Sequence, residues 1–155
     1  MSALPVDSLE MLPMTIADLD DLVPVEVQSY VVPWSRGNFI DSLAAGYECR
    51  VLRSSAGELL GYFIAMAGFE EMHLLNITVT PAHQGRSLAL MMLDELQAVC
   101  RQHGAAQLWL EVRISNDRAR SIYRRYGFAE VGLRRGYYPN PAGPREDAVL
   151  MSFTL

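Results

Sequence analysis

The chain has 155 residues, half of them hydrophobic, and a formal net charge of −5. These values fit a single domain over residues 1–155 with a substantial core, and they argue against nonspecific nucleic-acid binding. The negative charge is consistent with a cationic partner and equally with an ordinary solubilising surface. No apolar run approaches the ~20 residues of a membrane span, and the N-terminus carries Asp7 and Glu10 instead of a basic signal region. We therefore expect a cytoplasmic protein without membrane contact.

The N-terminal third predicts one strand followed by short helices. Leu9–Met14 predicts the strand, and Thr15 is a plausible cap for a helix after it. The apolar positions of that helix recur at helical spacing: Ile16, Leu19, Leu22 and Val23. Pro24 should interrupt it, because proline lacks the N–H that a helix interior needs, and the helix should resume through Tyr30. Ser35 predicts the cap of another short helix, with apolar residues Phe39, Ile40 and Leu43.

The middle of the chain predicts a hairpin, another strand and a long helix. Tyr47–Arg53 and Leu59–Met66 are the expected hairpin strands, because the Ser-Ser-Ala-Gly-Glu segment between them has turn chemistry. The next strand spans about Met72–Val79. An amphipathic helix follows over about Leu88–His103 and should end at Gly104, a natural left-handed cap.

The C-terminal third predicts a strand over Gln107–Arg113 and a helix over Asn116–Tyr126. Phe128–Leu133 and Ala148–Leu155 predict a closing strand pair, joined by a Pro/Gly-rich loop over Tyr138–Pro144. Two helices then cross between neighbouring strands. This order predicts a single-domain α/β (α+β) fold with a mixed, mostly antiparallel sheet flanked by helices.

Cysteines and histidines show no reactive or metal-binding spacing. Cys49 and Cys100 lie in apolar-rich segments without a CxxC pattern, so we expect reduced, buried thiols. The histidines His73, His83 and His103 are scattered, which predicts neither a metal cluster nor a nucleophilic triad. We therefore expect no bound metal and no covalent cysteine carrier.

Two segments indicate chemistry. Asn76-Ile-Thr-Val79 leads into Pro81-Ala-His-Gln-Gly-Arg-Ser-Leu-Ala89 and a helix, a start suited to a phosphorylated ligand. Leu108-Trp-Leu-Glu-Val-Arg113 leads into Tyr123 and Tyr126-Gly-Phe128, which places a carboxylate and a phenol around one strand-to-helix corner. Four further motifs accompany them: Pro33-Trp-Ser35, Ser115-Asn116, Tyr137-Tyr-Pro139 and Arg145-Glu-Asp-Ala148. The combination resembles the GCN5-related N-acetyltransferase superfamily over nearly the whole chain, and most closely its ribosomal-protein alanine N-acetyltransferases.

The resemblance implies acetyl-CoA as acetyl donor, bound between two splayed strands. The backbone of Ile77, Thr78 and Val79 would bond its pantetheine arm as an added strand would, although a plain core strand has the same sequence. The loop and helix start would hold its pyrophosphate, or form an ordinary loop with a glycine turn; the residues are Gln84, Gly85, Arg86, Ser87, Leu88, Ala89 and Leu90. Ser87 departs from the family pattern, which has glycine there, and its Cβ is penalised if the backbone needs a positive φ. Asn116 either contacts the cofactor or caps the helix beside it.

The resemblance assigns catalysis to Glu111 and Tyr123. Glu111 would be the general base that deprotonates the amine; the alternative is a solvated carboxylate or one paired with Arg113. Tyr123 would protonate the departing thiolate of coenzyme A, whereas helical periodicity alone assigns it to core packing. A regulatory domain that only binds coenzyme A is a further alternative, but it would not need this acid–base pair.

The substrate side rests on aromatic and acidic residues in loops. Trp34, Tyr137 and Tyr138 would wall a groove for a peptide terminus, or serve as hydrophobic plugs. Glu70 would attract a cationic segment, or is merely solvated. By resemblance, the substrate is the N-terminal alanine of a small-subunit ribosomal protein; other protein N-termini or a small amine are the alternatives. We expect no direct nucleic-acid partner and a monomer or weak oligomer.

Overall fold

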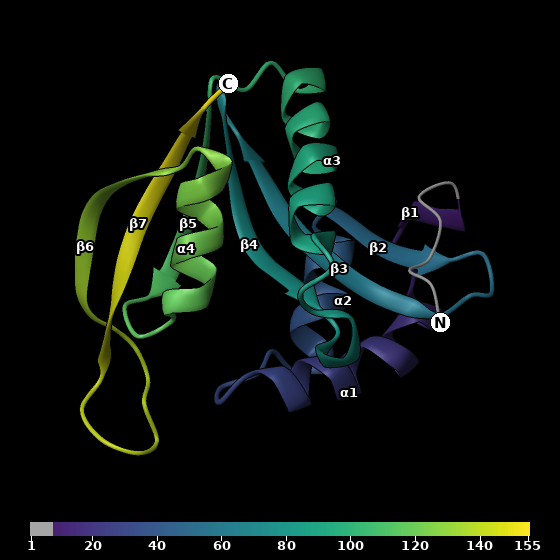
Figure 1. Ribbon diagram of the computed structural model, residues 1–155, viewed down its shortest axis with the longest axis horizontal. Helices are drawn as coiled ribbons and strands as arrows, with labels where there is room; N and C mark the ends of the chain where they lie inside the picture. The colour runs from purple at the N-terminus through teal and green to yellow at the C-terminus, as the bar shows by residue number, and fades with distance from the viewer. Residues whose placement is uncertain (1–7) are drawn as a thin grey trace. The chain divides into compact units, whose positions relative to one another are not determined.

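The computed structural model describes residues 8–155, so Asp7 lies outside the described residues (Figure 1). The strands of this part are β1 (Leu9–Pro13), β2 (Glu48–Ser54), β3 (Leu59–Gly68), β4 (Glu71–Val79), β5 (Gln107–Arg113), β6 (Ala129–Tyr138) and β7 (Glu146–Thr154). Its α-helices are α1 (Leu19–Ser29), α2 (Arg36–Ala44), α3 (Leu88–Gln102) and α4 (Asp117–Tyr126).

The strands are hydrogen-bonded in the order β1-β2-β3-β4-β5-β7-β6. β4 and β5 run parallel, whereas β1 with β2, β5 with β7, and β6 with β7 run antiparallel. The predicted mixed and mostly antiparallel α/β fold is thereby confirmed. The expectation that both crossing helices join neighbouring strands is correct for α3 and wrong for α4, because β7 lies between the two strands that α4 connects.

The chain forms two compact units. The first contains the residues up to Ile64 together with Asn76–Glu95, and the second contains Ala65–Leu75 together with Leu96–Leu155. That residues 1–155 act as a single N-acetyltransferase domain stays a prediction.

Helix α1 of the first unit contains Pro24 and is not interrupted by it. Proline removes one backbone hydrogen bond to the residue four positions earlier, which is why an interruption was expected. The helix persists because Leu19, Leu22 and Glu26, spaced three and four residues apart, are buried against the rest of the unit. Tertiary packing of one face contributes more to helix stability than local propensity does.

Of the two helix caps predicted in the first unit, Ser35 caps α2, whereas Thr15 caps a short 3₁₀-helix and not α1, whose N-cap is Asp18. The Thr15 N–H donates to Asp18 Oδ2 at 2.7 Å, but the turn that follows is a 3₁₀-helix, Ile16–Asp18, and α1 begins only after it. At α2, Ser35 Oγ accepts the Asn38 N–H at 3.1 Å, and the Ser35 N–H donates to Asn38 Oδ1 at 2.9 Å. The cap residues therefore located both helix starts to within one turn.

Strand β5 is central in the second unit and separates two unlike faces. Leu108, Leu110 and Val112 are buried on one face; the alternating side chains, among them Glu111 and Arg113, lie on the other. Helix α4 belongs to the apolar face, because the Tyr126 ring lies 5.3 Å from Phe153, whose register partner is Leu108. The face of the sheet away from α4 therefore carries Glu111 and Arg113 together with Trp109 and Leu150.

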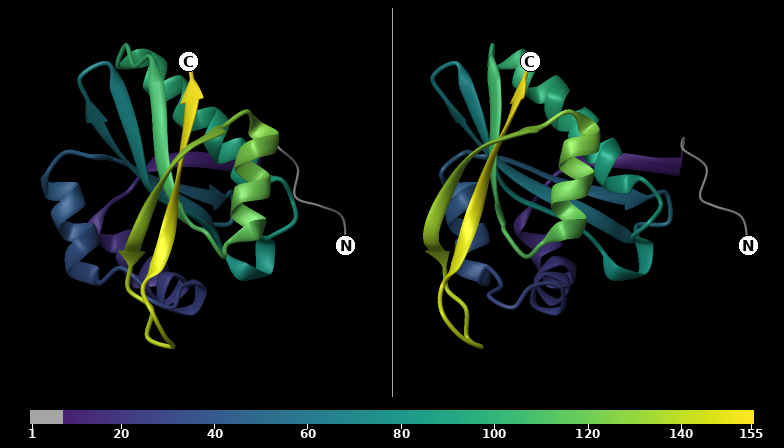
Figure 2. Two further views of the ribbon diagram at one scale, coloured as in Figure 1. Left: turned by 90° about the vertical axis from the view of Figure 1, so that its left-hand side faces the viewer. Right: turned by 60° about the vertical axis from the view of Figure 1, so that its left-hand side comes forward.

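The closing pair β6–β7 is longer than the sequence predicts, since β6 continues to Tyr138 and β7 begins at Glu146 (Figures 1 and 2). The register shifts between Arg134 and Tyr138, where Gly136 adopts φ 58°. The Gly136 N–H donates to Asp147 Oδ1 at 2.8 Å, so a side chain of β7 satisfies the backbone at this irregularity. Side-chain periodicity did not predict the full length of β6, because the strand contains polar residues where an alternating pattern has apolar ones.

Candidate active site

The start of α3 has backbone donors without an acceptor inside the helix. Helix α3 begins at Leu88, and its first regular bond runs from the Met91 N–H to the Ser87 carbonyl at 3.2 Å. The N–H groups of Leu88, Ala89 and Leu90 therefore have no acceptor within the helix. Together with the exposed Arg86, these donors give the positive character that a pyrophosphate requires.

Ser87 lies in the left-handed region of backbone space with φ 61°, close to Gly85 at φ 82°. The sequence departure thus falls on a residue whose conformation favours glycine. The donor geometry survives the departure, because serine retains its backbone N–H. Gln84 contributes a long contact from Nε2 to the Val79 carbonyl, 3.4 Å.

The expected cofactor strand, Ile77–Val79, is anchored from α1. The Tyr30 hydroxyl donates to the Ile77 carbonyl at 3.0 Å and lies 2.6 Å from Thr78 Oγ1. Burial raises the pKa of Tyr30 to about 12, so this phenol stays protonated at neutral pH. The Ile77 carbonyl already accepts one hydrogen bond and has a second lone pair. The predicted divergence of this stretch from β5 stays a prediction.

The buried side chain of Glu26, in α1, contacts the residue that precedes this strand segment, Asn76. Glu26 is 1% exposed, and its Oε1 accepts the Tyr62 hydroxyl at 2.8 Å and Asn76 Nδ2 at 3.0 Å. Its Oε2 accepts the Trp34 N–H at 2.9 Å. Neutral donors thus satisfy both oxygens of the buried Glu26 carboxyl group and tie Trp34 and Asn76 to α1.

Glu111 lies on the face of β5 away from α4, with its side chain 23% exposed. Its Oε2 is 2.9 Å from Arg134 Nε. This buried oxygen has no aligned hydrogen-bond donor among residues 8–155, so the pair is a charge contact. The ion partner of Glu111 is Arg134 and not the Arg113 given as an alternative, since Arg113 binds Glu146 at 3.0 Å. The Arg134 charge compensates Oε2, and the carboxylate has a second oxygen that can accept a proton.

Tyr123 is 9% exposed, and its ring lies 5.6 Å from that of Phe128. Phe128 in turn lies 5.4 Å from Phe153. The Tyr123 ring therefore packs on the helix-covered face, whereas Glu111 lies on the opposite face of the sheet. Core packing is confirmed for the ring, and the acid role of the hydroxyl stays a prediction.

Asn116 is the N-cap of α4, where its Oδ1 accepts the Ala119 N–H at 3.2 Å. The capping alternative is thereby confirmed, and contact with the cofactor stays a prediction.

The aromatic pair at the end of β6 lies close to the charges of β5. The rings of Tyr137 and Tyr138 meet edge to face at 5.0 Å. Arg134 lies 5.4 Å from the Tyr137 ring centre and Arg113 lies 4.6 Å from that of Tyr138, so each phenol carries a cation on its face. Burial, with Glu111 nearby, raises the pKa of Tyr138 to about 12. Arg134 therefore contacts both the proposed base, Glu111, and the aromatic pair.

The other two predicted substrate residues lie elsewhere. Trp34 packs on Phe39 at 5.2 Å in the core of the first unit, which supports the plug interpretation. Glu70 forms the turn before β4, and its neighbour Glu71 pairs with Gln107 at the start of β5. Glu111 lies four residues further along the strand, roughly 13 Å away. The structure does not bring Glu70 to the aromatic pair.

The cysteines, metal-binding residue types and helices of the described part of the chain give three further findings. Cys49 and Cys100 are buried free thiols, as predicted, and burial raises the pKa of each to about 11. Residues 8–155 contain no group of three metal-binding side chains. Within the same residues, no helix is long and apolar enough to span a membrane.

The sequence interpretation missed Arg134 and gave no role to Glu146, although the Arg145-Glu-Asp-Ala148 motif contains it. It considered Arg113 only as an ion partner of Glu111. Arg134 meets Glu111 only through the pairing of β6 with β7 and β7 with β5, which no local pattern reports.

Comparison with known proteins identifies the family. Residues 19–128 match the model of the acetyltransferase (GNAT) family, which uses acetyl-CoA as acetyl donor. The [ribosomal protein bS18]-alanine N-acetyltransferase of Haemophilus influenzae is 35% identical, over 89% of this chain and 93% of that protein. The enzyme of the same name from Escherichia coli K12 is 34% identical over 89% and 92%. The crystal structure of the ribosomal-protein-S18-alanine N-acetyltransferase from Escherichia coli has a TM-score of 0.85 at 32% identity, covering 94% of this chain and 93% of that one. The chain belongs to the GNAT acetyltransferase family.

Proposed function

We propose that this protein transfers the acetyl group of acetyl-CoA to the N-terminal alanine of ribosomal protein bS18. The observation that carries the proposal is the Glu111 carboxylate, which Arg134 holds at 2.9 Å beside the aromatic pair Tyr137–Tyr138. It occurs in a chain with relatives named for this reaction, two of which are 34% and 35% identical over 89% of its length. A carboxylate at this position suits an ammonium or amine group of the substrate.

Glu111 acts as the general base. A peptide α-amine has a pKa of about 8, so most of it is protonated at neutral pH and cannot attack a carbonyl. Glu111 accepts this proton, directly or through one water molecule. The cationic side chain of Arg134 at 2.9 Å holds the carboxylate in place.

Tyr123 acts as the general acid. Acetyl-CoA supplies the acetyl group as a thioester, and the Tyr123 hydroxyl donates its proton to the departing sulfur. A general acid must lie within hydrogen-bond reach of the sulfur, so the proposal requires the Tyr123 hydroxyl to reach the thioester from the face of the sheet opposite to Glu111. The transfer is direct, because buried thiols with pKa values of about 11 remain protonated at neutral pH and are poor nucleophiles.

The cofactor contacts in this proposal are those expected from the sequence. The backbone donors of Gln84–Leu90 and the Arg86 guanidinium hold the pyrophosphate, and the backbone of Ile77–Val79 bonds the pantetheine arm. Asn116 adds a contact through its amide nitrogen, since its oxygen caps α4.

Tyr137 and Tyr138 wall the peptide groove in this proposal, whereas Trp34, packed on Phe39, serves as a hydrophobic plug of the first unit. Glu70 is a weaker candidate, because it lies at the far end of β5 from Glu111. The remaining proposals are one domain over residues 1–155, a cytoplasmic monomer or weak oligomer, and no direct contact with nucleic acid or membrane.

The experiment is mass spectrometry of ribosomal proteins from a strain that lacks the gene. We expect bS18 to lose its N-terminal acetyl group, the wild-type gene to restore it, and a Glu111→Gln gene to leave it absent. An unchanged acetylation pattern would refute the substrate. Loss of acetyl groups from other N-termini, with bS18 unaffected, would favour a different protein substrate.

A further inference from the structure

Arg113, the last residue of β5, contacts the end of β6 and the start of β7 with its whole guanidinium group. One terminal nitrogen donates to Glu146 Oε1 at 3.0 Å, and the other donates to the Pro139 carbonyl at 3.0 Å. The group also lies 4.6 Å from the centre of the Tyr138 ring. One side chain thus fixes the aromatic residue and the backbone beside it.

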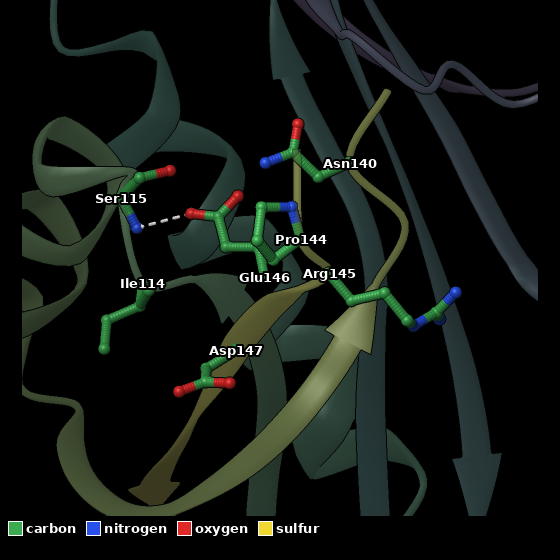
Figure 3. A pocket seen from close by; sticks show the side chains of 7 residues that line it. All are labelled: Ile114, Ser115, Asn140, Pro144, Arg145, Glu146 and Asp147. Carbon is green, nitrogen blue, oxygen red and sulfur yellow. Dashed lines mark hydrogen bonds between the residues drawn. The ribbon is translucent and has the colours of Figure 1, made fainter. Parts of the chain in front are cut away.

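Glu146 extends this set of contacts to α4. Its second oxygen, Oε2, accepts the Ser115 N–H at 2.9 Å (Figure 3). Ser115 immediately precedes Asn116, the N-cap of α4. The neighbouring Arg145 points away from Glu146 and donates to the Gly136 and Tyr137 carbonyls instead (Figure 3). Glu146 therefore joins β5, the α4 corner and β7.

These contacts are held within a partly buried pair. The side chains of Arg113 and Glu146 are 25% and 15% exposed, so solvent competes weakly for them. Arg113 follows Glu111 by two residues, so both side chains lie on one face of β5. The contact of Arg113 with Tyr138 therefore also fixes the position of Tyr138 relative to Glu111. Arginine suits this task because its planar group stacks and donates two directed hydrogen bonds at once, which lysine does not.

We propose that the ion pair Arg113–Glu146 positions Tyr138 and Pro139 for peptide binding, and so sets affinity for the peptide rather than for acetyl-CoA. The inference rests on the proposed function. Neither residue takes part in proton transfer; both act through the wall that they support.

The test is steady-state kinetics of purified full-length variants with acetyl-CoA and an alanine-initiated bS18 peptide. We expect Arg113→Met to raise the peptide KM roughly tenfold, the size typical of losing a coupled contact. The KM for acetyl-CoA should change by less than about twofold if the pair acts on the peptide wall alone. Arg113→Lys should fall between, since it keeps the charge but loses the stack and one donor.

A double variant separates positioning from general destabilisation. If Arg113 acts through Tyr138, Arg113→Met added to Tyr138→Leu should raise the peptide KM little beyond Tyr138→Leu alone. The matched control is Arg50→Met, since Arg50 is also 25% exposed and pairs with Glu48 within the first unit. Its melting temperature should fall by a similar amount while both KM values stay unchanged.

The outcomes distinguish this inference from the proposed function. Wild-type protein that binds acetyl-CoA but acetylates no alanine peptide overturns both. If the wild-type protein acetylates the peptide but Arg113→Met leaves the peptide KM unchanged, the inference alone is overturned. An equal rise of both KM values in Arg113→Met overturns it as well. If Arg113→Met does not fold, Arg113→Lys and Glu146→Gln decide, with faster amide hydrogen exchange at Ser115 expected in Glu146→Gln.

Discussion

Ser87 stores backbone strain that a single substitution can release. Its φ of 61° places Cβ close to the following carbonyl oxygen, at a cost of about 1–2 kcal/mol for a residue other than glycine. Ser87→Gly removes this cost, while greater freedom of the unfolded chain offsets about 0.4–1 kcal/mol of it. We therefore expect a free energy of unfolding higher by about 0.5–1 kcal/mol, and a Tm higher by roughly 1–4 °C for a chain of this size.

Two serine substitutions serve as controls for this gain in stability. Ser87→Ala keeps Cβ and hence the strain, so it should give no such gain. Ser35 precedes a helix in the same way but has an ordinary φ of −80° and accepts the Asn38 N–H. Ser35→Gly should therefore lower stability by about a few tenths of a kcal/mol, the opposite sign.

Thermal and denaturant unfolding measure the strain at Ser87. The strain is absent if Ser87→Gly is no more stable than Ser87→Ala.

Calorimetric titration with acetyl-CoA tests whether this loop binds the pyrophosphate. Affinity should be similar or slightly higher in Ser87→Gly and lower in Ser87→Asp, because the carboxylate lies beside phosphate. Equal affinity of wild type, Ser87→Gly and Ser87→Asp, all folded, would mean that this loop does not hold the pyrophosphate.

Three further substitutions test the second unit. Glu111→Gln should abolish most turnover but spare acetyl-CoA binding, because it keeps the side-chain size without the proton acceptor; wild-type turnover at neutral pH would exclude an essential base. Tyr123→Phe should slow the chemical step in single-turnover kinetics with little change in Tm, and an unaltered rate would leave only core packing. The pKa of Glu146 is lowered by hydrogen bonds from Ser115 and Arg113, so its stabilising contribution is complete above its ordinary value of 4.5 and is lost as pH falls through the lower folded value. The Tm difference between wild type and Glu146→Gln should accordingly shrink below that pH, and a growing difference would contradict the ion pair.

Local signals predicted most of the fold. Ser35 and Asn116 cap helices as expected, and the alternation of β5 places Leu108 and Leu110 on the buried face. The failures needed information from elsewhere in the chain. Pro24 stays inside α1 because of what the helix packs against, and α4 joins non-neighbouring strands because β7 pairs between them.

The candidate site likewise contains residues that local motifs located and one residue that they did not. Glu111 and Tyr123 belong to contiguous motifs, so the resemblance located them, and the structure adds that they lie on opposite faces of the sheet. Arg134 is different. Its contact with Glu111 depends on a register that includes a shift within β6, which side-chain periodicity does not reveal.

The two arginines of the site have parallel roles with different consequences. Arg134 joins Glu111 to Tyr137, whereas Arg113 joins Glu146 to Tyr138. A substitution of Arg134 removes the charge beside the proposed base and the support of an aromatic wall at once, so its effect on turnover mixes chemistry with binding. Arg113 pairs with a different carboxylate, and its substitution leaves the 2.9 Å contact between Arg134 and Glu111 in place. Because the Tyr137 and Tyr138 rings touch at 5.0 Å, both arginines still act on one aromatic wall. Substitution of Arg113 is therefore the change that reports on peptide binding separately from proton transfer.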